Sequence, residues 1–269
     1  MRNEEGCKSK INKSKINKST NRKSTNLMIA MIFAAGLGTR LAPLTNDRPK
    51  ALVEFNGKTM LENVAQKLVL AGCDRLVINV HHFSDMMKDF IKSHDFGAEV
   101  FISDETDMLL DTGGGMLKAR EFLEEEPHFI LYNVDVDCDI DIETMYTNHI
   151  QSGALATLAV KDRESTRSLI FDCSMRLCAW KNNITGESKI SWHPFNGDGR
   201  PLAFSGISIA SSEIFDLITE TGKFSITDLY LRLAKSELIE GYLHEGRWAD
   251  LGSVEKLRAA EQIIKSTNQ

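Results

Sequence analysis

The chain has 269 residues, of which 42% are hydrophobic and 26% charged, and its formal net charge is −6. This composition suits one globular domain with at most a small appendage. No apolar run is long enough to cross a bilayer, and the acidic balance disfavours a polyanion such as nucleic acid as the main partner. We therefore expect a cytoplasmic protein, and five cysteines without a CxxC pair favour reduced thiols over disulfides or a zinc site.

The charge is spread unevenly along the chain. Residues 1–26 hold eight Lys or Arg against Glu4 and Glu5, a net charge of +6, so the remainder carries −12. This tail contains the near-repeat SKINKSKINKS and lacks apolar periodicity, which predicts a disordered basic extension over residues 1–27. The apolar segment of a signal peptide does not follow its charges. We expect the functional domain to span residues 28–269, and truncation before Met28 to leave activity intact.

From Met28 onward, short apolar runs alternate with segments whose apolar residues recur at helical spacing. The runs predict buried strands at residues 28–35, 75–80, 99–103, 128–133 and 154–160. The spaced segments predict helices at residues 59–72, 84–94, 115–126 and 140–153. Strands that alternate with helices of this length imply crossover connections and a largely parallel sheet covered on both faces.

The pattern changes after Lys161. Short stretches separated by turn sequences predict antiparallel ribbons at residues 168–172, 176–180 and 189–192. The remaining patterns predict a buried strand and three helices, at residues 203–210, 212–218, 226–236 and from 253. The predicted fold class is therefore α/β, a Rossmann-like three-layer sandwich with a mixed, mainly parallel central sheet and a small antiparallel ribbon insertion.

The stretch FAAGLGTRLAPLTNDRPKAL follows the first predicted strand. In open α/β sheets, ligands bind beyond the carboxyl ends of strands. Gly36 and Gly38 let backbone N–H groups approach an anion closely. Thr39 adds a hydroxyl, and Arg40 adds a planar cation that grips phosphate oxygens in pairs. Lys50 follows a proline and supplies a second cation, so we expect this loop to hold a phosphate-rich ligand.

Two familiar phosphate-binding motifs are excluded here. A dinucleotide fingerprint needs a third glycine at the position of Leu41. The Gly-Lys-Thr at residues 57–59 lacks the glycine that a Walker loop requires five residues earlier, where Leu52 stands. We therefore expect the loop to bind phosphate in another way.

The same stretch resembles the signature of the sugar-1-phosphate nucleotidyltransferases, or nucleotide-sugar pyrophosphorylases, which reads G-x-G-T-R followed at a distance by P-K. Matching features extend to RWADLG, so the resemblance covers residues 28 to 265. LLDTGGGMLKA and NVDVDCDI are most similar to the short bacterial N-acetylmuramate-1-phosphate uridylyltransferases. The resemblance implies an enzyme that joins a nucleoside triphosphate to a sugar 1-phosphate and expels pyrophosphate.

This implied chemistry assigns roles to the loop. A sugar-phosphate oxygen attacks the α-phosphorus, so the protein has to align two polyanions and neutralise their charge. Arg40 is the catalytic candidate for the β- and γ-phosphates, and Lys50 is the candidate for the α-phosphate. Four further loop residues are expected to bind the nucleotide: Ala35, Gly36, Gly38 and Thr39.

Mg²⁺ is the implied cofactor, because it takes one or two carboxylates together with substrate phosphates. In the family, a Gly-Asp pair ends the strand predicted at 128–133. Asp135 takes the Asp position, and Val134 stands where glycine is usual. A W-x-D-x-G segment near the end of the chain supplies the second metal ligand, Asp250. We assign the neighbouring Asp139 and Asp141 to a turn or a helix cap.

Two further elements are implied to contact substrates. Three consecutive glycines before a predicted helix are expected to form a loop that reads the nucleobase through its backbone, at Thr112, Gly113 and Gly114. AFSGISIA resembles the strand whose glycine approaches the sugar, which makes Gly206 the sugar-binding candidate. Many relatives use another lysine for the sugar phosphate, and three basic residues lie near the predicted ribbons: Lys161, Arg163 and Arg167.

The predicted function is uridylyl transfer to an amino-sugar phosphate, with guanylyl transfer to mannose 1-phosphate or a heptose phosphate as the alternative. A metal-dependent glycosyltransferase would use Asp135 and Asp137 as a metal clamp, but that class expels no pyrophosphate and lacks the pairing of Arg40 with Lys50. A non-catalytic nucleotide sensor is disfavoured because both cations and both metal acids are present. The expected partners are the nucleoside triphosphate and the sugar phosphate, and the sequence does not indicate an oligomeric state.

Overall fold

The structure is a computed structural model that describes residues 28–191 and 197–267. The predicted basic extension at 1–27 and part of the last predicted ribbon and turn lie outside these residues. Within the described residues, no helix has both the length and the apolar character that crossing a membrane requires.

Four parallel strands form one half of the main sheet, in the order β6–β1–β4–β5, with β5 at its edge. They are β1 (Met28–Phe33), β4 (Cys73–Val80), β5 (Glu99–Asp104) and β6 (His128–Asn133). Every residue of β1 is buried, as expected for a strand with both faces covered. The predicted parallel strands are confirmed.

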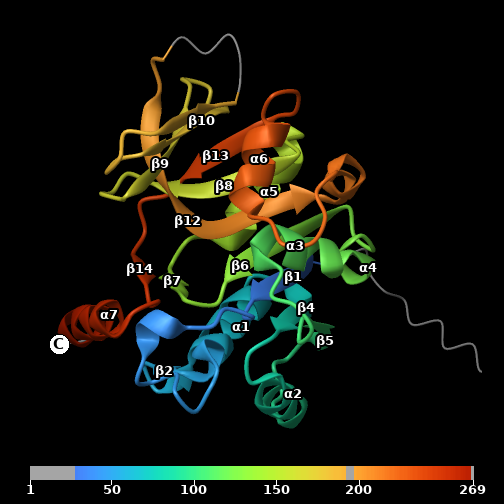
Figure 1. Ribbon diagram of the computed structural model, residues 1–269, viewed down its shortest axis with the longest axis vertical. Helices are drawn as coiled ribbons and strands as arrows, with labels where there is room; N and C mark the ends of the chain where they lie inside the picture. Colours follow the sequence, from blue (N-terminus) through green and yellow to red (C-terminus); the bar gives the residue numbers. More distant parts are fainter. Residues whose placement is uncertain (1–27, 192–196, 268–269) are drawn as a thin grey trace, which may run out of the picture.

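Helices cover both faces of this sheet (Figure 1). Side chains alternate along β1, so Ile32 joins one apolar cluster and Met31 the other. The first cluster includes side chains of α1 (Met60–Leu70), α2 (Ser84–Ser93), α5 (Ile142–Ser152) and α7 (Val254–Thr267). The second includes side chains of α3 (Asp111–Lys118), α4 (Arg120–Leu123) and α6 (Ile226–Leu233). The predicted three-layer sandwich is confirmed.

A mainly antiparallel half extends the sheet beyond β6, and its last strand in chain order pairs parallel with its neighbour. Its strands are β8 (Ala156–Lys161), β9 (Arg167–Phe171), β10 (Leu177–Asn182), β11 (Ser188–Ile190), β12 (Arg200–Ser211) and β13 (Ile239–Leu243). One end of β12 pairs with β6 and β8, and its other end pairs with β9. The predicted ribbon insertion, β9 to β11, is therefore confirmed and is continuous with the central sheet through β12 (Figure 1).

The smaller elements lie between these strands. Two short two-stranded sheets pair β2 (Glu54–Phe55) with β3 (Lys58–Thr59), and β7 (Val136–Cys138) with β14 (Trp248–Asp250). Three 3-10 helices span Thr39–Leu41, Lys50–Leu52 and Ser212–Leu217, the last of which replaces a predicted α-helix. The helix predicted at 115–126 is divided into α3 and α4 at Ala119.

The glycines expected in a loop lie inside a helix, so that prediction was wrong. Helix α3 begins at Asp111 and contains Gly113 and Gly114. A Cβ on Gly113 would overlap the ring of Phe224, and one on Gly114 would overlap the carbonyl of Gly222. The glycines therefore serve close packing of α3 against the segment before α6.

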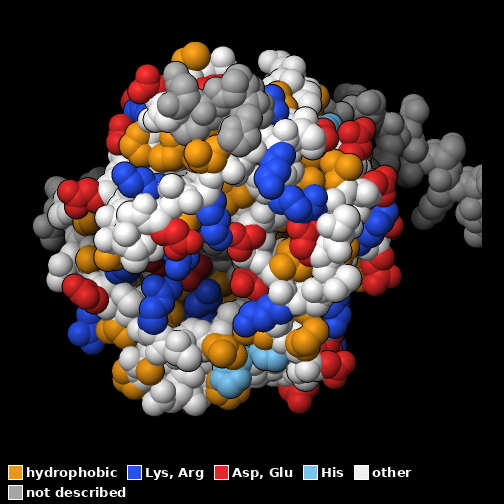
Figure 2. All heavy atoms as spheres, turned by 45° about the horizontal axis from the view of Figure 1, so that its top comes forward, with side chains coloured by type: hydrophobic (Ala, Val, Ile, Leu, Met, Phe, Trp, Pro, Cys, Tyr) orange, Lys and Arg blue, Asp and Glu red, His pale blue; other side chains and the backbone are white. Residues whose placement is uncertain are grey.

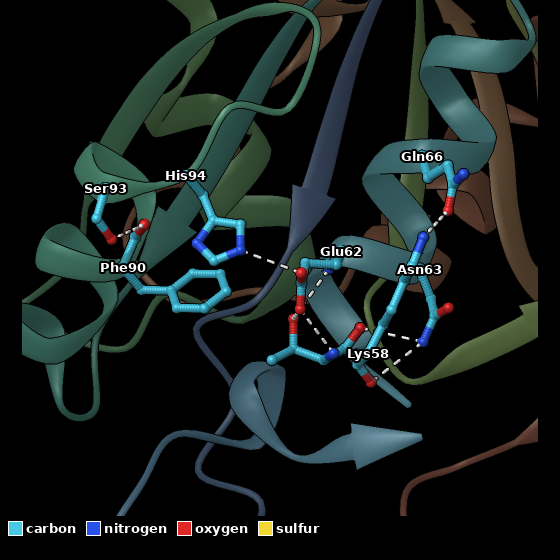
Figure 3. A network of polar contacts seen from close by, with 8 residues as sticks. Lys58, Glu62, Asn63, Gln66, Phe90, Ser93 and His94 are labelled. Carbon is cyan, nitrogen blue, oxygen red and sulfur yellow. Dashed lines mark hydrogen bonds and ion pairs between the residues drawn. The ribbon is translucent and has the colours of Figure 1, made fainter. Parts of the chain in front are cut away.

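Helix α1 has a complete N-terminal cap. The side chain of Thr59 accepts from the Glu62 N–H at 3.1 Å, and Glu62 accepts in return from the Thr59 N–H at 2.8 Å. His94 contacts Glu62 Oε1 at 3.1 Å through Nε2, and Figure 3 shows the imidazole of His94 facing the carboxylate of Glu62. Burial raises the pKa of Glu62, but the hydrogen bonds from Thr59 and His94 outweigh it and hold the pKa below its usual value.

Substituting Thr59→Ala should lower the free energy of unfolding by about 1 kcal/mol at pH 7, because the first turn of α1 loses its cap. A carboxyl whose pKa is lower in the folded than in the unfolded state stabilises the protein at any pH above its unfolded-state pKa. This stabilisation is lost as the pH falls through the folded-state pKa. The difference between Thr59→Ala and wild type should therefore shrink below pH 4.5, the ordinary value for Glu. Urea unfolding of wild type and Thr59→Ala at pH 7 and pH 3.5 measures this difference in the free energy of unfolding. An equal difference at the two pH values would contradict a role for the Glu62 charge.

Candidate active site

The loop after β1 is shaped around Lys50. Gly38 has a φ of 66°, and a Cβ there would lie 2.9 Å from Lys50 Cβ and 3.1 Å from Thr45 Cγ2. A Cβ on Gly36 would lie 3.2 Å from Lys50 Nζ. The two glycines therefore let the segment that carries Lys50 fold back against the loop.

A buried amide braces the start of this loop. Asn79, at the end of β4, accepts from the N–H groups of Ala34 at 2.6 Å and Ala35 at 3.2 Å. Its own NH₂ donates to Glu105 Oε1 at 2.7 Å, and Glu105 Oε2 accepts from the Leu110 N–H at 3.2 Å. Glu105 is fully buried, and burial raises its pKa although these hydrogen bonds oppose the rise. The network thus joins the loop after β1 to the start of α3.

Substituting Asn79→Asp should make the protein sensitive to pH. Two carboxyls would then meet where the amide now donates, and like charges at this distance raise the pKa of the pair. At low pH a proton shared by the introduced carboxyl and Glu105 replaces the lost hydrogen bond. When the pH rises and both carboxyls ionise, the two charges repel each other. We expect the melting temperature of Asn79→Asp to fall relative to wild type between about pH 6 and pH 9. Thermal melts across that range measure it, and a constant difference would contradict the network.

The two predicted metal acids lie on paired segments. Asp135 lies in the turn between β6 and β7, and Asp250 ends β14. These two short strands pair antiparallel with Asp250 opposite Val136, the neighbour of Asp135. The N–H of Leu251 also donates to the Asp135 carbonyl at 2.8 Å. Two residues 115 positions apart in the sequence are therefore held side by side.

The two carboxylates and the first cation face one point. A Cβ placed on Gly252 would lie 2.8 Å from Asp250 Oδ1, 2.9 Å from Arg40 Nη2 and 3.0 Å from Asp135 Oδ2. Lys50 Nζ lies 3.0 Å from the same Asp135 oxygen. The structure thus brings together all four residues that were predicted to act on the phosphates and the metal.

Asp250 is held in its ionised form. Burial raises the pKa of its carboxyl, but the hydrogen bonds from Lys256 and Gly252, with Arg40 nearby, outweigh burial and keep the pKa below its usual value. Lys256 Nζ donates to Oδ2 at 2.5 Å, and the Gly252 N–H donates to Oδ1 at 2.8 Å. The carboxylate is therefore charged at neutral pH, as a metal ligand must be.

A cavity of about 350 Å³ opens beside these residues. It is lined by residues of the loop after β1, the end of β6 and the start of α3, with one residue from before α6: Ala35, Gly36, Lys50, Asn79, Asp111, Thr112, Asn133, Asp135 and Lys223. Figure 2 shows basic and acidic side chains close together around a hollow on one face of the molecule. Its size and mixture of charges suit a nucleotide-sized polar ligand.

The predicted nucleobase segment contributes only in part. Thr112 lines the cavity, but its hydroxyl also accepts from the Ile226 N–H at 3.0 Å. The N–H groups of Gly113 and Gly114 both donate to the Phe224 carbonyl, at 2.9 and 3.3 Å. These two amides join α3 to the segment before α6, so a contact with the base would have to come from Thr112 and its neighbours on the wall of the cavity.

Two other predicted residues lie at the edge of this arrangement. Gly206 interrupts the register of β12 at a φ of 78°, and a Cβ there would lie 2.9 Å from both Asn133 Nδ2 and Val136 Cγ2. It therefore lets β12 approach the strand end that carries Asp135. Thr39 is exposed in the 3-10 turn beside Arg40 and does not line the cavity.

Comparison with known proteins places this arrangement in a family. A family model described as Nucleotidyl transferase matches residues 29–168, which is more than half of the chain. The chain belongs to the nucleotidyl transferase family. N-acetylmuramate alpha-1-phosphate uridylyltransferase of Caulobacter vibrioides is 33% identical over 245 residues, which cover 87% of this chain and 95% of the relative. Mannose-1-phosphate guanyltransferase beta-A of Xenopus laevis is 39% identical over 235 residues, 84% of this chain and 61% of that relative.

Solved structures share the fold of this nucleotidyl transferase. UDP-glucose pyrophosphorylase in complex with UDP-glucose superimposes with a TM-score of 0.73 over 90% of this chain and 99% of that chain, at 18% identity. HddC from Yersinia pseudotuberculosis complexed with GMP-PN gives a TM-score of 0.69 over 88% and 100%, at 23% identity. With the family and its relatives, the chain is a sugar-1-phosphate nucleotidyltransferase.

The acids of this nucleotidyl transferase fit Mg²⁺. Two carboxylates that face a common point are what the ion takes from a protein when substrate phosphates complete its shell. Among the described residues, no group of three or more His, Cys, Asp or Glu is placed to hold a metal. A divalent cation here would therefore be bound jointly by Asp135, Asp250 and the substrate.

Asp137 is not available to a metal ion, which argues against the glycosyltransferase alternative. Lys67 of α1 bonds one of its carboxylate oxygens and Arg247 bonds the other. The side chain is 8% exposed, so it is closed to a metal as well as neutralised. Asp137 instead joins α1 to the segment that leads into β14, and so supports both metal acids.

Four residues of the site were not predicted: Asn79, Glu105, Lys223 and Lys256. Asn79 carried a usable signal, since a buried amide inside the apolar run RLVINV needs partners. Lys223 and Lys256 are exposed lysines on a loop and a helix, and such residues usually lie on a solvated face. Their role appears only when their neighbours in space are known.

Proposed function

We propose that this enzyme transfers a uridylyl group from UTP to the 1-phosphate of an amino sugar of the N-acetylmuramate type and releases pyrophosphate. The observation that carries the proposal is the point beside Gly252 at which Asp135, Asp250 and Arg40 converge, next to Lys50. The relative from Caulobacter vibrioides, whose name states this reaction, matches along 95% of its length.

The cations act on the phosphates in this proposal. Lys50, which lines the cavity, would leave Asp135 for the α-phosphate, where charge develops in the transition state. Arg40 lies beside both acids and would hold the β- and γ-phosphates as they depart as pyrophosphate. Asp135 and Asp250 would hold Mg²⁺, which when bound neutralises phosphate charge and orients the triphosphate. Displacement is in line, and the protein forms no covalent bond.

Lys223 is our candidate for the lysine of the acceptor phosphate. It lines the same cavity as Lys50 and Asp135. Its ammonium makes no hydrogen bond or ion pair with the residues that the structure describes. The loop that carries it is fixed by Phe224, which donates to the Leu110 carbonyl at 3.2 Å and accepts from α3. A free cation on a fixed loop at the cavity wall suits an incoming sugar phosphate.

Guanylyl transfer to mannose 1-phosphate is the second candidate. It is favoured by the Xenopus laevis relative, which has the higher identity, 39%. A match over 61% of that relative's length, against 95% for the uridylyltransferase, places it second.

Four nucleoside triphosphates assayed against a panel of sugar 1-phosphates with Mg²⁺ test the proposal through pyrophosphate release. We expect the highest kcat/KM for UTP with N-acetylmuramate 1-phosphate. Preference for GTP with mannose 1-phosphate would select the second candidate. Absence of pyrophosphate release from every pair would overturn the proposed reaction.

A further inference from the structure

A second cavity, of about 440 Å³, lies between the ribbon insertion and the start of α6. Side chains of β9, β10 and β11 form one wall and residues of α6 and β12 form the other. The residues that matter here are Arg167, Trp180, Glu187, Lys189, Phe204 and Asp228.

The two cavities adjoin along two separate stretches of chain. On β12, Phe204 lines the second cavity, and Gly206, two residues on, contacts Asn133 of the first. Before α6, Lys223 lines the first cavity, and Ser225, again two residues on, lines the second. Two residues of extended chain span roughly 7 Å. The second cavity is therefore within reach of a ligand whose phosphate lies near Lys223.

One face of the ribbon carries an aromatic ring beside charged side chains. Trp180 lies opposite Leu169 on β9 and Lys189 on β11, so these three side chains share a face. Arg167 is two residues from Leu169 and shares that face as well. Lys189 Nζ lies 5.3 Å from the centre of the Trp180 ring and 3.2 Å from Asp228 Oδ1. An aromatic ring flanked by charged groups is a common platform for a carbohydrate ring and its polar substituents.

Of the three basic residues expected near the ribbons, two are already engaged. Lys161 Nζ donates to the carbonyls of Glu245 and Gly246, both at 2.8 Å. The Arg163 guanidinium lies 3.7 Å from the centre of the Trp248 ring and donates to the Phe204 carbonyl at 3.1 Å. The guanidinium of Arg167 makes no hydrogen bond or ion pair within the described residues, although it lines the cavity. It is free to bind an anion of the ligand.

We propose that Arg167 determines specificity by binding a carboxylate carried on the ring of the acceptor sugar. The inference rests on the proposed function, because it places the sugar in the second cavity. The reacting phosphate has to lie beside Lys50 and Asp135 in the first cavity, so an anion at Arg167 belongs to the other end of the sugar. Guanidinium binds a carboxylate through two parallel hydrogen bonds.

The other charged groups of the cavity fit the same ligand. Glu187 immediately precedes β11 and lines the same cavity as Trp180, and its carboxylate suits sugar hydroxyls or an amide N–H. Lys189 is neutralised by Asp228. Arg167 therefore remains as the cation for an acidic substituent, and a neutral sugar would leave it in water.

Two acceptors that differ only in that substituent test the proposal. N-acetylmuramate 1-phosphate carries a lactyl carboxylate that N-acetylglucosamine 1-phosphate lacks. With Arg167→Gln, we expect the KM for the carboxylated acceptor to rise about 10- to 100-fold, the value of a charge-assisted contact. The KM for the neutral acceptor should stay within about twofold of wild type, and the kcat for both should be unchanged. Arg167→Lys should give an intermediate KM, because it keeps the charge and loses the paired geometry.

Arg200→Gln is the matched control, because Arg200 is an exposed arginine of the same region that pairs with Asp162 and lines neither cavity. An equal loss for both acceptors in Arg167→Gln would place Arg167 on the shared phosphate or in a structural role and overturn the inference. The inference would also be overturned if the wild-type enzyme showed no preference for the carboxylated acceptor. Calorimetric binding of the two sugar phosphates repeats the comparison without turnover, so the inference is tested even if the proposed transfer reaction fails.

Discussion

Lys50→Met is expected to lower kcat about 100-fold or more, because a preorganised cation at the α-phosphate acts mainly in the transition state. Lys50 Nζ lies 3.0 Å from Asp135 and directly beside Gly36, so no other group needs to move to present it to the cavity. Pyrophosphate release under saturating substrates measures kcat. The melting temperature of the variant should be measured beside kcat, since Lys50 and Asp135 form a largely buried ion pair whose loss also costs stability.

Lys58→Met is the matched control for this variant. Lys58 lies in the Gly-Lys-Thr stretch that resembles part of a Walker loop, but its ammonium donates to Gln66 Oε1 at 2.6 Å (Figure 3). Lys58 does not line the first cavity. Turnover of Lys58→Met should equal that of wild type. If Lys50→Met retained wild-type turnover, Lys50 would be a partner of Asp135 in the free enzyme and not a catalytic residue.

Asp137→Asn is expected to lower the free energy of unfolding by about 2 to 3 kcal/mol, because Lys67 and Arg247 lose the charge that both contact. The loss is smaller than for a fully buried pair because the side chains of Lys67 and Arg247 are 30% and 39% exposed. Urea unfolding at neutral pH measures it. A second effect should follow at the active site, since Asp137 lies on the strand pair that sets the spacing of the metal acids. The affinity for Mn²⁺ or Mg²⁺ should fall with the stability.

Asp139→Asn provides the comparison in the same segment. Its side chain is exposed and forms no ion pair within the described residues, so its substitution should change stability by less than about 0.5 kcal/mol. Equal losses in the two variants would show that the net charge of the segment matters, and not the bridge made by Asp137.

Local patterns predicted most of the fold. The first strand and helices α1 and α5 could be predicted without knowledge of distant residues. A continuous apolar run predicts a strand buried on two faces, and apolar residues at helical spacing predict a helix buried along one stripe. Asp141 was assigned to a turn or cap, and it caps α5 by accepting from the Thr144 N–H at 2.9 Å. The prediction for the glycines of α3 was wrong because a local pattern does not show distant packing partners. Their packing partners, Phe224 and Gly222, are distant in the sequence, so the three glycines suggested a loop.

The sequence by itself determined the loop that holds the two cations and predicted the two metal acids, because residue type, short spacing and resemblance to a family are properties of one stretch of chain at a time. The tertiary structure decided which acid lines the cavity and which is enclosed by two cations. Asp135 and Asp137 look alike in NVDVDCDI, yet only the positions of Lys67 and Arg247 close Asp137 to a metal. The physical reason is that the state of a charged side chain depends on the charges within a few ångströms, and the fold brings those charges from remote segments.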